Sequence, residues 1–386
     1  MLTLLACGKG ENVPSEEGAP ADAPVEGNVV AAPAENLPSE AILLEGPLKE
    51  KVQIPVETVT LESLKENFAA REVTTDFVLG FYPEEEIVYQ DVTAPDKIAL
   101  DTVRITHLKT GESQDVSLEV EYEYFYSAWM NGENLALLLY RDDGGADYVY
   151  IDPEGNQKRV EFDGVDSMTA YPNDEGLYIR YEEYIGDDQV DATLVFMPYE
   201  GDEAKEIHKG SFTLDENDVV QEGNFFMEFF AMDNTVGFQE ISSMNEENFE
   251  VLGSYLWDLD QDSLYKVDFV DQLSGFFSGT PELMVDYHAM EGEDGLAIYK
   301  SDGDGYTPYV LEGYESDGYF WDANFLKDGR LVLDGDENMD FVDLETVTAK
   351  RISASEGTLL MYLPKTNTLY FKEDGDNIIY WGEVEK

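Results

Sequence analysis

Oxygen-bearing side chains recur at alternate positions in one short stretch of the chain. Asp334, Asp336 and Asn338 offer side-chain oxygens, Asp340 offers a backbone carbonyl, and Glu345 offers a carboxylate with two oxygens. Calcium takes about six to eight oxygen ligands, and a glutamate that ends such a series binds through both of its oxygens. The spacing therefore predicts a calcium site formed by these five residues.

The stretch resembles the calcium loop of EF-hand proteins, with oxygens at odd positions and a glutamate at the last position. It departs from that loop where Met339 replaces the glycine that permits a sharp turn. Its flanks have the pattern of strands, and Asp334-Gly335 alone is sufficient for an acidic hairpin, so both interpretations are kept. A second set at alternate positions has no glutamate at the right distance: Asp258, Asp260 and Asp262.

Catalytic motifs are absent from the sequence. The histidines His107, His208 and His288 are far apart, with no pair at metal-ligand spacing. No Gly-x-Ser-x-Gly motif and no Gly-rich, Lys-bearing phosphate loop occurs. The 84 acidic residues form so many close pairs that none is selected for glycoside cleavage. We therefore expect a binding or scaffolding module for an unidentified ligand, and keep as alternative an extracellular carbohydrate-active or other hydrolytic enzyme.

Three aromatic runs are candidates for a sugar- or peptide-binding face: residues 122–126, 225–230 and 319–321. Aromatic rings beside carboxylates suit both sugar rings and cationic peptides. The favoured interpretation is that alternate members of these runs pack between neighbouring sheets, where bulky side chains are needed.

The N-terminus resembles the end of a bacterial lipoprotein signal peptide, in which Leu, an apolar or small residue and Ala precede a lipidated Cys. The matching residues are Leu4, Leu5, Ala6 and Cys7, the one cysteine of the chain. The preceding apolar run is shorter than in a working signal, which a start assigned too late would explain. The resemblance implies a lipid on Cys7 and an extracytoplasmic location at a bacterial membrane or cell surface. The alternative is a cytosolic protein with a stray cysteine.

The segment that follows Cys7 has the composition of a spacer. Residues 8–48 are rich in Pro, Ala and Glu and poor in cations, so they are expected to form an extended, self-repelling tether. Residues 49–386 are expected to form one folded domain. In this interpretation residues 1–7 are the remnant of the signal peptide.

The charge of the chain limits its partners. With 84 acidic and 23 basic residues, the net charge is −61. DNA, RNA and anionic membranes are excluded as partners because phosphate contacts need clustered Lys and Arg. We expect a monomer whose partners are cationic, neutral or metallic, such as a protein, a peptide or a glycan, and which meets the membrane only through the lipid on Cys7. Adaptation to high salt is a second explanation of the acidity.

A unit of strand, turn and strand recurs along the chain at intervals of about 40–60 residues. Its starts are near residues 105, 150, 196, 256, 298, 341 and 379. Around residues 318–352 the unit reads as four short strands joined by Asp/Gly and Thr-bearing turns. The pattern predicts an all-β protein, and it resembles the quinoprotein-like and Trp-Asp-repeat propellers. We expect seven four-stranded blades, with six or eight blades or a pair of β-sandwiches as alternatives.

The last unit has three strands before the chain ends, so an N-terminal strand is expected to complete it. Residues 51–60 alternate apolar and polar side chains, and Pro55 suits an outermost strand. We therefore predict that residues 51–60 pair antiparallel with residues 377–384. Deletion of residues 1–48 should then be harmless. A short helix is predicted at residues 62–71.

Overall fold

The structure is a computed structural model. It describes residues 29–31, 40–46, 48–73, 77–94, 100–118, 122–141, 144–163, 167–172, 176–185, 189–199, 204–214, 220–222, 229–232, 235–245, 248–269, 277–286, 296–312, 320–325, 330–335, 338–354, 358–363, 366–373 and 375–384. The chain forms two compact units: one combines residues 1–6, 59–166 and 352–386, and the other combines residues 7–58 with 167–351.

The first unit contains three four-stranded antiparallel sheets. The first sheet is β6 (Val78–Tyr82), β7 (Ile87–Asp91), β8 (Thr102–His107) and β9 (Glu112–Ser117); the second is β10 (Tyr122–Asn131), β11 (Asn134–Arg141), β12 (Gly145–Ile151) and β13 (Gln157–Asp163); the third is β31 (Leu359–Leu363), β32 (Thr368–Lys372), β33 (Ile378–Glu383) and β5 (Ala69–Glu72). Strand β5 precedes the other strands of its sheet in sequence, so it joins an N-terminal segment to the last C-terminal strand.

The second unit contains four more sheets of the same kind, two of them linked through β18 (Val220–Glu222). These are β14 (Ser167–Pro172), β15 (Gly176–Tyr184), β16 (Gln189–Pro198) and β17 (Lys205–Leu214); β19 (Phe229–Met232), β20 (Thr235–Asn245), β21 (Asn248–Asp258) and β22 (Ser263–Val267); β23 (Phe277–Thr280), β24 (Leu283–Asp286), β25 (Ala297–Ser301) and β26 (Tyr306–Leu311); and β27 (Phe320–Phe325), β28 (Arg330–Gly335), β29 (Asn338–Asp343) and β30 (Thr348–Ser353). Seven four-stranded blades make the chain a seven-bladed β-propeller, which confirms the predicted fold class.

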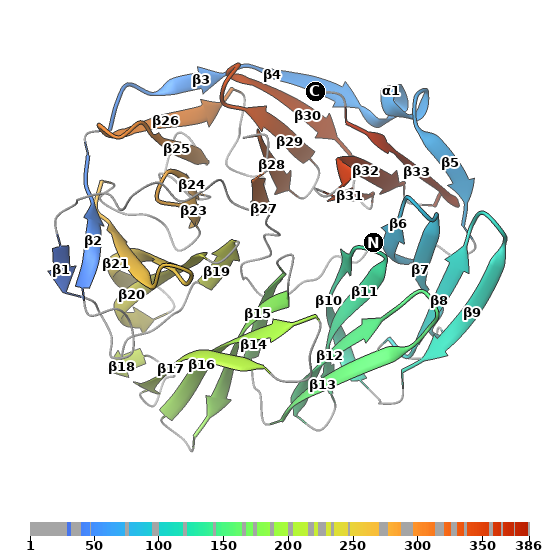
Figure 1. Ribbon diagram of the computed structural model, residues 1–386, viewed down its shortest axis with the longest axis horizontal. Coiled ribbons are helices and arrows are strands. Elements are labelled where there is room, and N and C mark those ends of the chain that lie inside the picture. Colours follow the sequence, from blue (N-terminus) through green and yellow to red (C-terminus); the bar gives the residue numbers. More distant parts are fainter. Residues whose placement is uncertain are drawn as a thin grey trace. The chain divides into compact units, whose positions relative to one another are not determined.

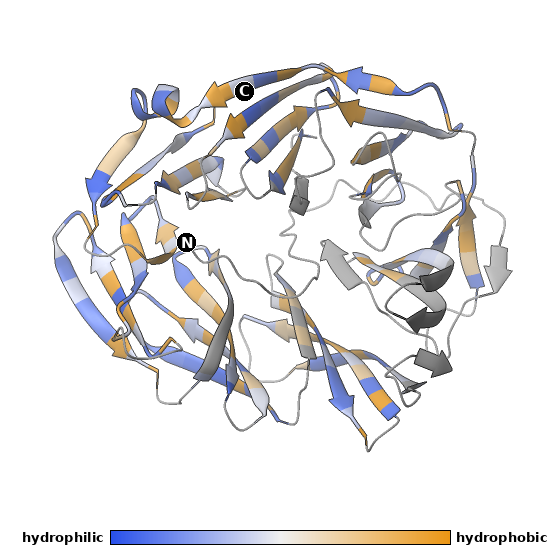
Figure 2. Cartoon of the chain, turned by 180° about the vertical axis from the view of Figure 1, so that it is seen from behind, coloured by the Kyte–Doolittle hydropathy of each residue, from blue (hydrophilic) through white to orange (hydrophobic). Residues whose placement is uncertain are grey.

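Packing between consecutive blades forms the core. Side chains of a strand alternate between the two faces of its sheet, and a strand between two packed blades buries both faces. Every described residue of β32 is buried, as are all but the first of β11, whereas most of β9 is exposed. Figure 2 accordingly shows the outer strand β9 as mainly hydrophilic. Apolar runs therefore occupy the strands packed between blades, and the outer strand β9 is polar.

The predicted pairing of residues 51–60 is wrong. This run forms two strands, β3 (Val52–Ile54) and β4 (Val56–Thr60), which lie beside β26 and β30 (Figure 1). Pro55 separates them because it has no N–H for a ladder. The strand that completes the last blade is β5, whose Glu72 and Arg71 pair antiparallel with Ile378 and Ile379.

The predicted helix is also shorter than expected. Helix α1 (Leu61–Lys65) ends well before residue 71, and β5 begins at Ala69. Between them, the ring of Phe68 packs on Phe371 with a centroid distance of 5.9 Å. Packing of this half-buried ring takes the chain out of the helix and to the edge of the last blade. No helix among the described residues is long and apolar enough to cross a membrane.

Folded structure also occurs before residue 49. Strand β2 (Glu40–Leu44) pairs parallel with β22, and β1 (Val29–Ala31) pairs with β2. Ala41 and Leu44 are buried in the core of the second unit. Part of the expected tether is therefore an outer strand of the fold.

Candidate functional site

Acid–base pairs between the third and fourth strands recur in four blades. The pairs are Arg104 with Asp115, Asp147 with Arg159, Asp191 with Lys209, and Asp340 with Arg351. Each pair joins neighbouring strands of one sheet, so it helps to fix which face of the outer strand turns inward. The pairs differ greatly in burial: Asp147 and Asp340 are fully buried, whereas the Asp115 side chain is 49% exposed.

The largest of these charge clusters lies on β10–β13. Asp147 of β12 accepts hydrogen bonds from the Nη1 of Arg141 at 2.7 Å and from the hydroxyl of Tyr122 at 2.9 Å. The Nε of Arg159 lies 2.5 Å from Oδ2 of Asp147, the same oxygen that accepts the hydrogen bond from Tyr122. All four strands of the blade thus contribute, and we call this set the blade-two charge network, together with Glu161 and Asp163 of β13.

The strands position the network through their register. Asp147 is paired with Glu161, and Gly145 with both Arg141 and Asp163. A Cβ at Gly145 would collide with Arg141 Nη2 and lie 2.8 Å from the Phe162 carbonyl oxygen. Glycine at this position therefore leaves the space in which the guanidinium of Arg141 reaches both Asp147 and Asp163.

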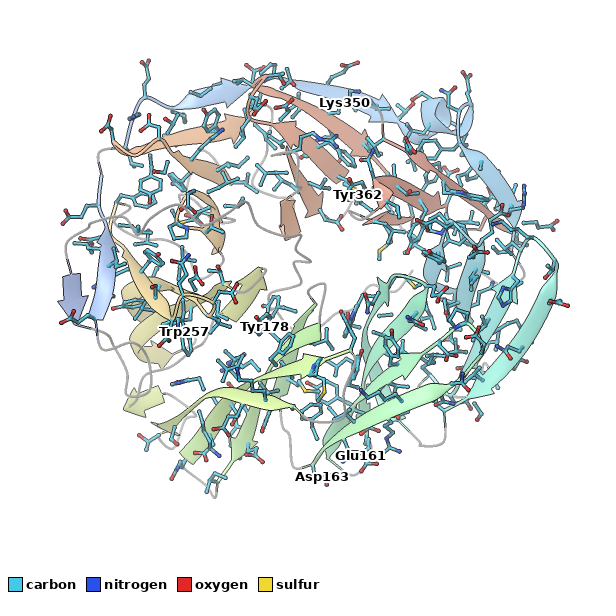
Figure 3. The ribbon with its side chains drawn as sticks, in the orientation of Figure 1. Glu161, Asp163, Tyr178, Trp257, Lys350 and Tyr362 are labelled. Carbon is cyan, nitrogen blue, oxygen red and sulfur yellow. The ribbon has the colours of Figure 1, made fainter. Side chains whose placement is uncertain are left out.

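The inner and outer parts of the network differ in solvent access. Arg141 is 6% exposed, whereas Glu161 and Asp163 are 55% and 83% exposed. Figure 3 shows these two carboxylates on β13, the outermost strand of the blade. Burial, the charge of Asp147 and their hydrogen bond all raise the pKa of Tyr122, so its hydroxyl stays a donor at neutral pH. The inner part holds the strands together, and the outer part presents carboxylates to solvent.

The structure distributes the predicted calcium ligands over both ends of one strand. Asp334 is the penultimate residue of β28 and is paired with Met339, and Asn338 begins β29, so both lie at the β28–β29 hairpin. Glu345 follows the far end of β29, in a turn where its N–H donates to Asp343 Oδ1. Asp336 lies outside the described residues. The hairpin interpretation thus describes the backbone here, and the calcium site stays a prediction.

The side chain of Asp340, whose backbone carbonyl is the predicted ligand, forms an ion pair with Arg351. Both of its carboxylate oxygens accept hydrogen bonds from Arg351 at 2.8 Å. Burial raises the pKa of Asp340, and the hydrogen bonds and charge of Arg351 oppose that rise. Among the described residues, no group of three or more His, Cys, Asp and Glu side chains is placed to hold a metal ion.

The remaining candidates are dispersed. His107 ends β8, His208 is buried on β17, and His288 and Cys7 lie outside the described residues. In the second alternate-residue set, Asp258 accepts the N–H groups of Asp260 and Gln261 and so forms an ordinary turn. Of the aromatic runs, Tyr122 is described as buried, in agreement with packing between blades.

Sequence reasoning missed the charge network, although a signal for it exists. Lys158-Arg159-Val160 of β13 and Lys350-Arg351-Ile352 of β30 are nearly the same tripeptide, and each arginine pairs with a buried aspartate on the preceding strand. A comparison of the blades by charged residues, in place of turns, would have identified both pairs.

Comparison with known proteins gives fold likeness at low identity. No protein-family model and no curated protein matches the sequence. Among solved structures, the propeller domain of the Trilobed protease from Pyrococcus furiosus is 14% identical, with a TM-score of 0.47, over 83% of this chain and 95% of that one. An oligogalacturonate lyase from Vibrio parahaemolyticus is 12% identical, with a TM-score of 0.45, over 83% and 92% of the two chains. Neither likeness assigns an activity to this chain.

Proposed function

We propose that this chain is a lipoprotein, held outside the cytoplasm through a lipid on Cys7, whose propeller is a non-enzymatic binding module for a cationic partner. The proposal combines the resemblance of residues 4–7 to a lipoprotein signal with the charge distribution of the folded part. The proposal specifies a positively charged partner, which is a protein or a peptide.

The observation that carries the proposal is that the fold uses its cations internally. Six arginines contact carboxylates within the chain: Arg71, Arg104, Arg141, Arg159, Arg180 and Arg351. Lys49, Lys65 and Lys209 do the same. Even if every one of the 23 basic residues neutralised one acid, 84 − 23 = 61 negative charges would remain.

Such an excess has a direct consequence for association. Unpaired carboxylates create a negative potential that attracts cations and accelerates their encounter, and salt screens the effect over about 8–10 Å. Partners with clustered Lys and Arg are favoured, and acidic partners are repelled. A membrane anchor is compatible with this role because strands β2 to β5, which follow the anchor in sequence, pair with the outer strands of the blades.

One experiment tests both parts of the proposal. The chain is expressed in a bacterium with a functional signal sequence ahead of Cys7, and binding of a fluorescent oligolysine peptide is measured in membrane and soluble fractions. We expect binding in the membrane fraction, weakened by at least about tenfold between low and physiological salt. Cys7→Ser should move the same binding to the soluble fraction.

The matched control is an oligoglutamate peptide of equal length, which should not bind. Equal binding of both peptides, or no binding of oligolysine, would contradict the charge-based function. Wild-type protein that stays soluble would contradict the anchor alone.

A further inference from the structure

The N-terminal run shows that outer edges of this propeller accept an additional strand. Strand β2 pairs parallel with β22, β3 pairs parallel with β26, and β4 lies beside β30. Backbone bonds join each pair: Asp268 N–H to the Leu44 carbonyl at 3.2 Å, Glu312 N–H to that of Ile54 at 2.9 Å, and Ala349 N–H to that of Pro55 at 3.1 Å. Among the described residues, three blades thus carry a fifth strand drawn from the same chain.

The edge of β13 resembles the covered edge of β30. Both strands contain the tripeptide Lys-Arg followed by a β-branched residue, at 158–160 and 350–352, and both arginines bind a buried aspartate of the preceding strand. In the part of the chain that the structure describes, β13 is the last strand of its four-stranded sheet. β13 therefore presents the same kind of edge that β4 covers on β30. No described strand covers this edge of β13.

The backbone groups that β13 presents at this edge follow from its pairing. The N–H of Asp152 donates to the Asn156 carbonyl just beyond the β12–β13 ladder. Hydrogen-bonded and non-hydrogen-bonded pairs alternate along an antiparallel ladder, so Lys158, Val160 and Phe162 bond to β12. The backbone groups of Arg159, Glu161 and Asp163 then point outward, which is the arrangement that strand addition needs.

Charge selects the occupant of this edge. Glu161 and Asp163 lie at the C-terminal end of β13, where Glu161 contacts Arg159 and Asp163 contacts Arg141. Both carboxylates remain more than half exposed, so their outer sides still face solvent. The N-terminal residues of this chain before β1 are acidic, with Lys9 as their one cation, so they would be repelled there. A partner with lysine or arginine at that end would be attracted. The carboxylates thus distinguish β13 from β30, where Ser353 occupies the corresponding end.

We propose that the outer edge of β13 binds an extended segment of a cationic protein as a fifth strand. The segment runs parallel to β13, as β2 and β3 run parallel to their neighbours, and has β-branched residues followed by Lys or Arg. Main-chain bonds supply affinity, and Glu161 and Asp163 select the basic end. This inference rests on the proposed function, since it gives a site and a binding mode to the same cationic partner.

The test uses a fluorescent peptide that repeats residues 54–60 of this chain, which include β4, and ends in two added lysines. A second peptide ends in two glutamates. We expect saturable binding of the lysine peptide to the full chain and binding at least about tenfold weaker for the glutamate peptide. The covalently attached β4 keeps the β30 edge occupied, because its effective concentration far exceeds that of a free peptide.

Three variants locate the binding. Glu161→Pro removes an outward N–H from an edge strand, where proline is tolerated, and should weaken binding of the lysine peptide by about tenfold or more. Glu161→Ala keeps the N–H and should weaken it by only a few-fold. Ser113→Pro removes an outward N–H from β9, the last strand of its sheet among the described residues, and should leave binding unchanged. The outward direction of the Ser113 N–H follows from the bond of Leu118 N–H to the Asp101 carbonyl.

Unchanged binding by Glu161→Pro, loss of binding with Ser113→Pro, or no binding of the lysine peptide by wild-type protein would overturn the inference. Circular dichroism and thermal melting confirm that each variant is folded. Retention of oligolysine binding by Glu161→Pro, together with unchanged binding of the lysine peptide, would refute the β13 site while leaving the proposed function in place.

Discussion

Buried carboxylates show how single residues hold the outer strands of this propeller. Asp147 and Asp340 are both fully buried, and each is matched by an arginine from the next strand. A buried charge is stable in a fold only while its partners remain, because desolvation of a lone charge is costly. These two positions should therefore be far more sensitive to substitution than the exposed acids that surround them.

The first prediction compares a buried pair with an exposed one. Asp147→Asn leaves Arg141 and Arg159 beside a neutral side chain and should lower the free energy of unfolding by about 3 kcal/mol or more. The matched variant Asp115→Asn breaks the more exposed pair with Arg104 and should cost about 1 kcal/mol or less. Urea denaturation of both variants measures the difference. Equal losses would show that burial is not what makes the network important.

A second prediction at this scale concerns acid. His208 is buried on β17, with its ring edge-on to Trp257 of β21 at a centroid distance of 6.4 Å (Figure 3 labels Trp257). Burial lowers the pKa of His208 below its ordinary value of 6.5, and the charge of Glu206 opposes this shift. As the pH falls through 6.5, the unfolded chain takes up a proton that the folded chain does not, so stability decreases.

His208→Gln should therefore flatten the loss of stability between about pH 7 and about pH 5. His107→Gln is the matched control, because His107 is only half-buried at the end of β8, and it should keep the wild-type slope. Denaturant midpoints measured across this pH range provide the comparison. An unchanged slope in the His208 variant would mean that carboxylates alone govern the acid response.

At the scale of elements, the N-terminal run is part of the fold. Strands β2, β3 and β4 each lie against an outer strand, and β5 completes the last blade. Ile54 is fully buried among Val285, Ile298 and Leu311, so this run also contributes to the core. The run forms hydrogen bonds with backbone groups that would otherwise be exposed on several sheet edges.

The structure changes the expected effect of deleting residues 1–48. A chain that begins at residue 49 lacks β2, with the buried side chains of Ala41 and Leu44 and the backbone bonds to β22. It should lose at least about 2 kcal/mol of stability. A chain that begins at residue 28 keeps β1 and β2 and should match the full chain. Chemical denaturation of both shortened proteins measures the difference. Equal stability of the two would show that β2 contributes little.

At the scale of the whole molecule, each compact unit is a run of consecutive blades packed on their neighbours. One hydrophobic cluster joins the β6–β9 and β10–β13 blades, and another joins the last blade to the first. In the second unit, similar clusters join consecutive blades. The stability of such repeat proteins is approximately the sum of the stability of each repeat and the energy of each interface between neighbours. A substitution in one blade should therefore destabilise mainly that blade and the blades in contact with it. The charge excess acts on the molecule as a whole and is reduced by salt.

The sequence by itself determined the all-β class, the seven blades and the acidic character. These properties depend on local signals, namely alternation of side chains, turn residues and net charge, which are readable without knowing which strands meet. It also indicated that an N-terminal strand completes the last blade, because the final unit has three strands.

Only the tertiary structure decided which N-terminal strand that is. Residues 51–60 have the clearer alternation, but edge pairing depends on which distant strand ends are open, and Pro55 divides this run between two blades. The polar segment Ala69–Glu72 takes the final edge because the half-buried ring of Phe68 packs against Phe371. The charge network of Asp147 was hidden for the same reason: its members are near neighbours only through the register of four strands, and charged residues are expected on the surface unless packing brings partners together.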